Sequence, residues 1–423
     1  MNHYDLVIIG GGSGGLSSAI SAHEEGIKSI LILEKDEYLG GILNQCIHNG
    51  FGIKIFNEEL TGPEYAYNLI KMVNDRNISY KTNTMVTNIT KDKVITYINN
   101  IDGLQKIKAK AIILSTGCYE RTKEAINIPG TRPTGVFTAG LAQKYVNMEG
   151  YLTGKRIFIL GSGDIGLIMA RRMTLEGAKV LGVAEIMPYS NGLNRNIVQC
   201  LNDFNIPLYL SHTVKEIIGE EKLEKVIISK VDENLKFIEG SEFLVDCDCL
   251  LLSVGLIPSN NLLEEMGVLM DEVTKGPVVN SDLQTSVNGI FSCGNSLHVH
   301  DLVDNVTLEG RKAGISAANY IKGLLKEEQL INLHHDKLIG YLIPQKIKLN
   351  ENVEVFFRVK KPLKDVYLYV KQKNEIIKKI KKPYLLPSLM ESIKLNINNP
   401  EEIEIGVMYD WTCLYCLSTR LYA

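Results

Sequence analysis

The sequence predicts an α/β fold with two Rossmann-like domains, the first split by insertion of the second, plus a small C-terminal β-sandwich-like domain. Two observations predict the Rossmann-like domains. A glycine cluster follows an apolar strand and opens a helix near residue 10, and the same arrangement returns near residue 161. The third observation is a change beyond about residue 329, where glycine becomes scarce and apolar residues alternate with polar ones. That alternation predicts short strands with one buried face.

Length, charge and cysteine content narrow the class of protein. A chain of 423 residues is too long for one core, so two or three domains are expected. A net charge of −3 without a long basic run points away from nucleic-acid and anionic-membrane partners. Eight cysteines are too few for a disulfide scaffold in so long a chain. No apolar run approaches the roughly 18 residues of a membrane helix. We therefore expect a cytoplasmic protein without a membrane span.

The first glycine cluster has the spacing of a dinucleotide-binding turn. It follows the strand at 4–10 and reads G-x-G-x-x-G at Gly10, Gly12 and Gly15. In this pattern the first glycine permits a tight turn, the second lets the backbone approach a pyrophosphate, and the third lets helix and strand pack closely. Glu34 ends the next strand, 24 positions after Gly10, where an acid can bind both ribose hydroxyls. These surroundings disfavour the alternative of a plain glycine-rich turn.

The second glycine cluster has the same arrangement of a strand, a glycine turn, a helix and a terminal acid. It reads G-x-G-x-x-G at Gly161, Gly163 and Gly166, Asp164 opens the helix, and Glu185 lies 24 positions after the first of these glycines. Two such units predict two dinucleotides, and two dinucleotides imply electron transfer between them.

Glu185 also bears on which nicotinamide dinucleotide binds. A carboxylate at this position accepts a hydrogen bond from a 2′-hydroxyl and repels a 2′-phosphate. No basic residue adjoins it, and Arg195 is the nearest arginine downstream. We expect NAD(H) in preference to NADP(H); the alternative is that a loop arginine sets the choice.

Three further apolar strands end in small residues, at 111–117, 249–255 and 289–295, and a helix is expected from about Val306 to Leu324. The order of these blocks resembles the two-dinucleotide-binding flavoprotein superfamily that includes glutathione, thioredoxin and nitrite reductases. The resemblance covers about residues 4–325. It implies that the first unit binds FAD and that the second, inserted unit binds NAD(P)H.

The resemblance also implies two sets of contact residues. The FAD set comprises Gly10, Gly12, Ser13, Gly15, Glu34, Lys35, Gly41, Val86, Thr116, Gly117, Gly294 and Asn295. The NAD set comprises Gly161, Gly163, Asp164, Gly166, Glu185 and Gly255. The family usually has Asp where this chain has Asn295, whose amide can still hydrogen-bond a hydroxyl.

Four segments resemble a narrower bacterial subgroup, at 40–52, 59–66, 130–137 and 300–304. That subgroup is often encoded beside a glycerol-3-phosphate dehydrogenase flavoprotein and is related to flavin subunits of hydrogen cyanide synthase and opine oxidase. Its members tend to act as one subunit of an electron-transfer complex. The resemblance implies a partner, either a second flavoprotein or another electron-transfer subunit, and an oligomer or hetero-complex.

One cysteine follows the Gly40-Gly41 pair, where the disulfide reductases of the superfamily carry two. Cys46 and His48 would share one face of an extended segment, and a histidine cation would lower the thiol pKa and make a nucleophile. A single-cysteine redox centre is one interpretation; a flavin pocket lined by both residues without covalent chemistry is the other. His298 and His300 also have two interpretations, as groups near the flavin pyrimidine edge that stabilise anionic reduced flavin, or as surface histidines.

The C-terminal segment predicts strands at 353–359, 365–371, 392–397 and 402–407. A sandwich without obvious catalytic residues suggests docking to a partner. The chain ends in a C-x-x-C at Cys413 and Cys416, which is either a redox dithiol, part of a metal site, or a chance placement.

The expected domains are the FAD-binding domain at 1–120 and 251–328, the NAD(P)-binding domain at 121–250, and the β-rich docking domain at 329–423. The expected function is FAD-dependent hydride transfer with NAD(H), within a complex with a dehydrogenase of the glycerol-3-phosphate type. One alternative is a free-standing NADH-dependent reductase of peroxide, persulfide or disulfide through Cys46. The other is an interaction protein that has kept the fold and lost redox activity, which the intact glycine spacing disfavours.

Overall fold

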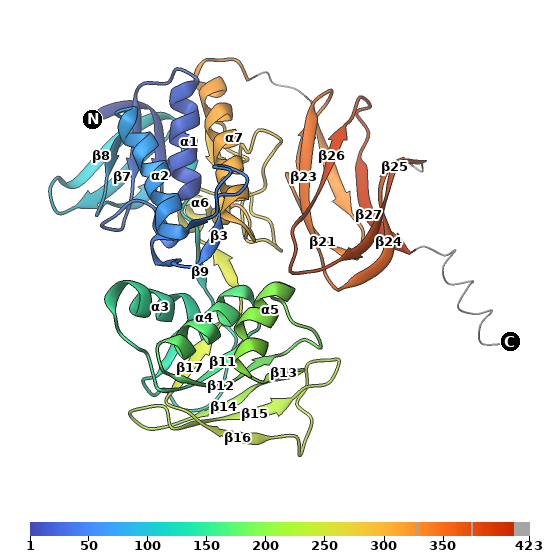
Figure 1. The fold of residues 1–423 in the computed structure, drawn as a ribbon. Helices are drawn as coiled ribbons and strands as arrows, with labels where there is room; N and C mark the ends of the chain where they lie inside the picture. Colours follow the sequence, from blue (N-terminus) through green and yellow to red (C-terminus); the bar gives the residue numbers. More distant parts are fainter. Residues whose placement is uncertain (326–328, 374, 410–423) are drawn as a thin grey trace. The chain divides into compact units, whose positions relative to one another are not determined.

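The first glycine turn connects a buried strand to a buried helix, as its sequence requires. The computed structural model describes residues 1–325, 329–373 and 375–409. The chain divides into two units: Met1–Leu43, Asn49–Gly117 and Pro258–Ala423 form the first, and Asn44–His48 and Cys118–Ile257 form the second (Figure 1). The predicted α/β class is confirmed, with parallel sheets of the Rossmann type and a separate set of antiparallel strands.

The first unit is built on a seven-stranded sheet in the order β5-β2-β1-β8-β7-β6, with β19 paired to β8. β1 is parallel to both β2 and β8, and residues Leu6–Ile9 of β1 are at most 5% exposed. The strands are β1 Asn2–Ile9, β2 Ile30–Leu33, β5 Ser79–Lys81, β6 Met85–Ile89, β7 Val94–Asn99, β8 Gly103–Leu114 and β19 Ile290–Ser292. Strands β3 Asn49–Phe51 and β4 Leu60–Thr61 form a small separate ribbon.

The helices of this unit are α1 Ser13–Glu24, α2 Gly62–Asp75, α6 Asn261–Glu265 and α7 Val303–Ile321. α1 and α7 lie side by side (Figure 1). A Cβ on Gly310 would lie 2.4 Å from the Gly14 carbonyl oxygen, and a Cβ on Gly314 would lie 2.2 Å from the Ser18 carbonyl oxygen. These glycines therefore allow the two helix backbones to meet. The helix predicted from Val306 is confirmed and begins one turn earlier.

The second unit contains a parallel five-stranded sheet in the order β10-β17-β11-β12-β13. Its strands are β10 Val136–Thr138, β11 Arg156–Leu160, β12 Lys179–Glu185, β13 Leu208–Leu210 and β17 Cys249–Leu252. An antiparallel sheet is formed by β14 His212–Ile218, β15 Lys225–Lys230 and β16 Phe243–Asp246. The helices are α3 Ala139–Lys144, α4 Asp164–Leu175 and α5 Asn194–Cys200. Where the chain passes between the units, β9 Cys118–Glu120 pairs with β18 Leu256–Pro258.

Residues 329–373 and 375–409 form the predicted β-sandwich. Its five-stranded sheet has the order β22-β20-β27-β24-β25, and its three-stranded sheet has the order β21-β23-β26. The strands are β20 Leu330–His335, β21 Ile339–Ile343, β22 Lys346–Lys348, β23 Asn352–Val359, β24 Leu363–Gln372, β25 Glu375–Leu385, β26 Glu391–Asn396 and β27 Ile403–Tyr409. All four segments predicted from alternation are strands, because every second residue enters one apolar core that includes Val355, Phe357 and Leu368.

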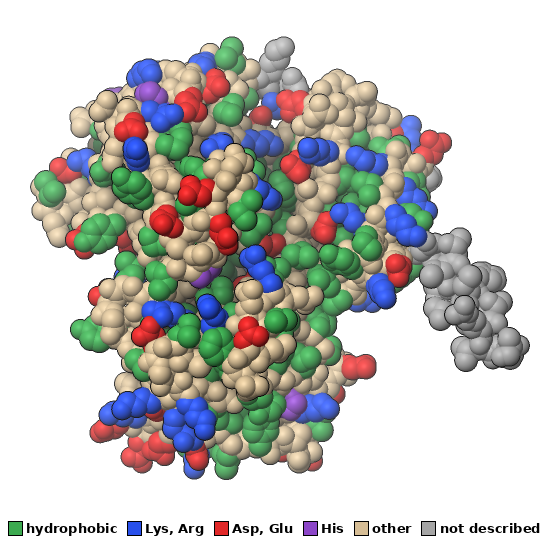
Figure 2. Space-filling model, viewed as in Figure 1, with side chains coloured by type: hydrophobic (Ala, Val, Ile, Leu, Met, Phe, Trp, Pro, Cys, Tyr) green, Lys and Arg blue, Asp and Glu red, His purple; other side chains and the backbone are tan. Residues whose placement is uncertain are grey.

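β25 forms one edge of the five-stranded sheet and is exposed along almost its whole length. It carries Lys378, Lys379, Lys381 and Lys382, and basic side chains gather over this edge in Figure 2. Lysines on an edge strand keep it from pairing with other strands. Among the described residues, no helix is long and apolar enough to span a membrane.

Candidate functional site

In the first glycine turn, two of the three glycines have no room for a side chain, and the third has open space beside it. Gly10 has a φ of +104°, and a Cβ on Gly15 would lie 1.9 Å from the Gly10 carbonyl oxygen. A Cβ on Gly12 would meet nothing within 4 Å. Gly10 and Gly15 therefore serve the fold, whereas the space beside Gly12 is available to a ligand, as a pyrophosphate requires.

The N-terminus of α1 provides donors for that ligand. Gly12 is the N-cap, no side chain caps the helix, and no acidic residue lies in the first turn. The N–H groups of Ser13 and its neighbours are the unpaired donors of a helix start, which bind anions. Gly41 lies against this turn, because a Cβ placed on it would be 3.2 Å from the Gly12 Cα.

The Glu34 carboxylate is buried and held by the backbone. Its Oε2 accepts from the Gly11 N–H at 2.6 Å, its Oε1 accepts from the Asp36 N–H at 2.9 Å, and the residue is 5% exposed. A carboxylate has about four acceptor positions, so two remain for hydroxyl groups. The neighbouring Lys35 is exposed, and Val86 is buried in an apolar core that also includes Val7 and Leu31.

Two distant segments meet this turn. A Cβ on Gly14 would lie 2.7 Å from Ser115 Oγ and 3.6 Å from Cys293 Sγ, so the ends of β8 and β19 lie beside α1. Thr116 donates from its hydroxyl to the Ser259 carbonyl at 2.7 Å, and Gly117 has a φ of +67°. The structure thus brings the predicted FAD residues of three segments to one end of the sheet.

Asn295 makes a hydrogen bond that the sequence did not predict. Its Oδ1 accepts from the His300 N–H at 3.0 Å, while the N–H of Gly294 donates to Glu309 Oε2 at 2.6 Å. The first bond closes the loop after β19 on itself, and the second attaches the start of that loop to α7. An aspartate at this position could accept the same bond from His300, so the departure from the family pattern does not alter this fold.

The second glycine turn has the same construction. Gly161 has a φ of +101°, a Cβ on Gly166 would lie 2.5 Å from the Gly161 carbonyl oxygen, and a Cβ on Gly163 would find its nearest neighbour at 3.6 Å. Gly255 has a φ of +103°, and a Cβ on it would find its nearest neighbour, Arg121, at 3.9 Å. In the second turn, as in the first, the first and third glycines have no room for a side chain and the second has open space beside it.

Glu185 accepts hydrogen bonds at both oxygens. Oε2 accepts from the N–H and the hydroxyl of Ser162 at 3.0 and 2.7 Å, and Oε1 accepts from the Met187 N–H at 3.0 Å. The Asp164 carboxylate accepts from the Leu193 N–H at 2.8 Å and the Asn196 amide at 2.7 Å. Asp164 was expected at the nucleotide, and its bonds to the following loop were not predicted.

Cys46 does not lie on an extended strand. It follows a 3-10 helix, Gly41–Gln45, and is grouped with the second unit, where its Sγ lies 3.8 Å from Gln143 Oε1. Burial raises the pKa of its thiol to about 12, opposite to the direction predicted for a nucleophile beside His48. His48 is half-buried two residues further along.

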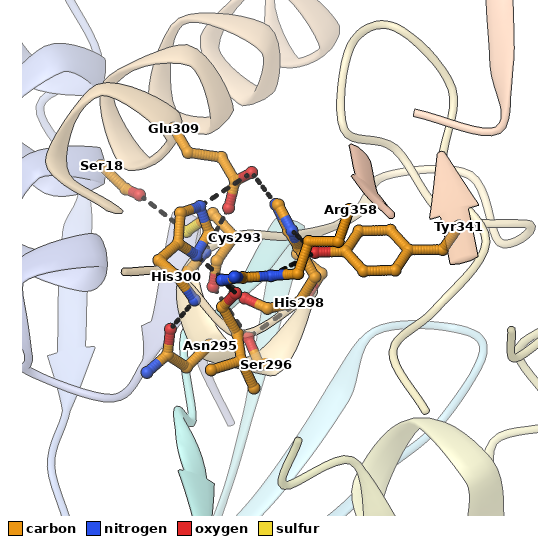
Figure 3. Close-up of polar contacts among 12 residues, drawn as sticks. Ser18, Cys293, Asn295, Ser296, His298, His300, Glu309, Tyr341 and Arg358 are labelled. Carbon is orange, nitrogen blue, oxygen red and sulfur yellow. Dashed lines mark hydrogen bonds and ion pairs between the residues drawn. The ribbon is translucent and has the colours of Figure 1, made fainter. Parts of the chain in front are cut away.

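His298 and His300 are not surface residues, so the surface interpretation was wrong. Their side chains are 1% and 3% exposed, and both face Glu309 of α7 (Figure 3). His298 Nε2 lies 3.0 Å and His300 Nε2 lies 3.5 Å from Glu309 Oε1. Burial is the main cause that lowers the pKa of His298, and the neighbouring His300 lowers it further. Although burial raises the pKa of Glu309, the two histidines hold it well below its usual range.

A second layer of polar groups supports this cluster. Arg358 of β23 pairs with Asp301 and donates to the Tyr341 hydroxyl at 3.2 Å and the Val299 carbonyl at 3.2 Å (Figure 3). Glu309, Arg358 and Tyr341 were not predicted as site residues. For Glu309, the sequence offered one signal: an acidic residue directly before Gly310 inside a helix that is otherwise amphipathic. Cys413 and Cys416 lie outside the described residues.

Known proteins match the part of the chain that carries both turns. A family model described as pyridine nucleotide-disulphide oxidoreductase matches residues 4–310. A ferredoxin–NADP reductase of Picrophilus torridus is 27% identical over 76% of this chain and 94% of its own length. An opine oxidase subunit of Agrobacterium tumefaciens is 23% identical over 75% of this chain and 66% of its own. The crystal structure of T. acidophilum thioredoxin reductase superposes with a TM-score of 0.62 at 26% identity, covering 77% of this chain and all of that one.

Proposed function

This chain belongs to the pyridine nucleotide-disulphide oxidoreductase family and is an FAD-dependent NAD(P)H oxidoreductase, and we propose that it transfers hydride between NAD(H) and FAD as the electron-transfer subunit of a larger complex. The observation that carries this proposal is the duplication of one construction. Each Rossmann unit has a crowded turn glycine, an open second glycine and a buried acid bonded to the turn. Two intact dinucleotide sites in one chain are what hydride transfer between two cofactors needs.

The residues of the first unit fit FAD. The open space at Gly12 and the uncapped start of α1 suit the pyrophosphate, and Glu34 retains acceptor positions for ribose hydroxyls. When bound, FAD would supply the hydride-accepting chemistry. The chain's own contribution is to hold and orient the cofactor, so no strong general base is required of it.

The preference for NAD(H) is supported by the surroundings of Glu185. Its carboxylate is 4% exposed, and the next residues are Ile186 and Met187, which offer no positive charge to a 2′-phosphate. Calorimetric titration of the FAD-loaded protein with NAD⁺ and with NADP⁺, which cannot reduce the oxidised flavin, tests this preference. We expect at least tenfold tighter binding of NAD⁺, about 1.4 kcal/mol. Equal affinities would contradict the role proposed for Glu185.

The partner is proposed on three grounds. The family model ends at residue 310, so the β-sandwich is an addition to it. This domain exposes apolar side chains that a partner could cover, Ile376, Ile377 and Tyr384 of β25, although the lysines of that strand disfavour strand pairing. The relative in Agrobacterium is by name one subunit of an oxidase. A second flavoprotein of the glycerol-3-phosphate dehydrogenase type is the partner we propose.

Affinity purification of the tagged chain from its native host tests the partner. We expect a second flavoprotein in stoichiometric amount, and its loss when residues 329–423 are deleted. A chain that purifies alone and turns over NADH with a small acceptor at full rate would contradict the subunit role.

The second candidate function is reduction of a peroxide, persulfide or disulfide through Cys46. The segment carrying Cys46 is ordered against α3 by the Gln45 amide, which donates to the Gly140 carbonyl at 2.8 Å. The raised thiol pKa argues against a resident thiolate. Cys46→Ser decides between the candidates: loss of acceptor reduction with unchanged flavin reduction by NADH would favour the second, and unchanged turnover would exclude it.

A further inference from the structure

We propose that His298, His300 and Glu309 bind one divalent transition-metal ion, of the class represented by Zn²⁺. The ligand atoms of the three side chains all lie within 4.8 Å of one another. Two imidazole nitrogens and one carboxylate oxygen form a donor set that such ions prefer. The proposal concerns a site beside the dinucleotide residues and does not depend on the proposed function.

The separations of the ligand atoms suit a tetrahedral ion. Bonds of about 2.0–2.1 Å to nitrogen and oxygen give ligand–ligand separations of about 3.3 Å at tetrahedral angles. Glu309 Oε1 lies 3.0 Å from His298 Nε2 and 3.5 Å from His300 Nε2. Two edges of a tetrahedral face therefore have nearly the required length, and the ligand atoms of the two histidines lie within 4.8 Å of each other, so side-chain adjustments would bring all three atoms onto one ion.

The outer nitrogens of the histidines are engaged in the way that metal-binding histidines require. His300 Nδ1 lies 2.9 Å from the His298 carbonyl oxygen. Because a carbonyl can only accept, this nitrogen carries a hydrogen, and a neutral His300 ring would then have its lone pair at Nε2. His298 Nδ1 lies 3.5 Å from the Tyr341 hydroxyl. Glu309 Oε2 accepts from the Gly294 N–H, which leaves Oε1 facing both rings.

The charge of the cluster calls for a cation. Glu309 is 7% exposed, and a buried carboxylate must be compensated. Arg358, the nearby arginine, is already paired with Asp301. A bound divalent ion would neutralise the carboxylate and hold the loop that carries Asn295 on α7. The competing arrangement is a proton on His300, which makes an ion pair with Glu309 and leaves no room for a metal.

Zinc binding to the full-length FAD-loaded protein tests the site. Cys413→Ser and Cys416→Ser are included in every sample so that the terminal thiols do not contribute. After removal of metal with a chelator, titration with Zn²⁺ is expected to show one equivalent bound. His298→Gln, His300→Gln and Glu309→Gln should each weaken that binding at least about tenfold. The matched control is His334→Gln, which removes a histidine 3.3 Å from a carboxylate of Glu402 on the surface and should leave Zn²⁺ binding unchanged.

Two results would overturn the proposal without depending on the stability of a variant. One is a parent protein that binds less than one equivalent of Zn²⁺, with a His300 ring shown by NMR to be an imidazolium. The other is Co²⁺ substitution that gives no tetrahedral absorption bands at wavelengths beyond the flavin. Variants that bind Zn²⁺ as tightly as the parent would place the metal elsewhere and equally contradict it.

Discussion

Glu34 and Glu185 occupy equivalent positions in the two Rossmann units and accept the same two hydrogen bonds from backbone N–H groups. Each carboxylate accepts from the N–H of the second residue of its glycine turn, Gly11 or Ser162, and from the N–H two residues beyond itself. The difference is the Ser162 hydroxyl, which also donates to Glu185 at 2.7 Å. The second unit therefore has less acceptor capacity for a ribose, and we expect it to bind its nucleotide more weakly than the first.

Substitution of each acid by its amide should separate the two sites. Glu34→Gln replaces an acceptor that the Gly11 N–H uses, so we expect the protein to lose bound FAD on dialysis. Glu185→Gln should keep its FAD and bind NAD⁺ about tenfold more weakly, a change of about 1.4 kcal/mol. The measurements are the ratio of flavin to protein absorbance and the NAD⁺ dissociation constant of the oxidised protein. Each variant is the control for the other, and an FAD loss shared equally by both would contradict the assignment.

Two glycines of the first turn should respond in opposite ways. Gly15→Ala places a methyl group 1.9 Å from a backbone oxygen, so the fold should lose about 2 kcal/mol or more of stability. In Gly12→Ala the new methyl group lies in open space, and the φ of −77° is allowed for alanine. The free energy of unfolding should therefore change by less than about 1 kcal/mol, whereas FAD binding should be lost because the methyl group occupies the space proposed for the pyrophosphate. Urea unfolding of the FAD-free protein and FAD titration measure the two effects. A Gly12→Ala protein that retains FAD would contradict the position given to the pyrophosphate.

Arg358 and Asp301 should show strong coupling. The pair is largely buried, and removing one member leaves the other charge without its partner, at a cost of about 3–5 kcal/mol. We expect Arg358→Met and Asp301→Asn each to be strongly destabilising and the double variant to be less so than the sum. A double-mutant cycle by urea unfolding measures this. Lys373→Met with Glu401→Gln, a pair that includes an exposed lysine, is the matched control and should show little coupling. Additive effects at Arg358 and Asp301 would mean that the two charges do not interact.

His298 should make stability depend on pH in a defined direction. Burial lowers its pKa in the folded protein, whereas the unfolded chain keeps the ordinary value of 6.5. Below that pH the unfolded chain binds a proton that the folded protein does not, so the free energy of unfolding falls as the pH falls through about 6.5. In the presence of a chelator, the free energy of unfolding of His298→Gln should decrease less steeply than that of the parent between about pH 7 and 5. The difference between the two slopes should be up to about 1.4 kcal/mol per pH unit. His334→Gln should keep the parent slope, and a parent slope in His298→Gln would show that His298 is already protonated in the folded protein.

The parts of the fold that could be predicted are those with a local signature in the sequence. The glycine turns and their acids are specified within about 25 residues, and the strands of the β-sandwich alternate with period two. The Arg358–Asp301 pair joins residues 57 positions apart, and no local pattern links them. The segment before Cys46 is a 3-10 helix because Gly40 and Gly41 adopt positive φ angles of 107° and 57°, which end the extended conformation that the prediction assumed.

The central claim, that both Rossmann units bind a dinucleotide and exchange hydride, is tested most directly by anaerobic mixing. The yellow protein is mixed with NADH and, separately, with NADPH, and the flavin absorbance is followed over time. We predict rapid bleaching by NADH, slower bleaching by NADPH, and a slowed NADH reaction in Glu185→Gln. If neither nucleotide bleaches the flavin, the second unit does not deliver hydride, and the flavin must be reduced by a substrate or by another protein of the complex.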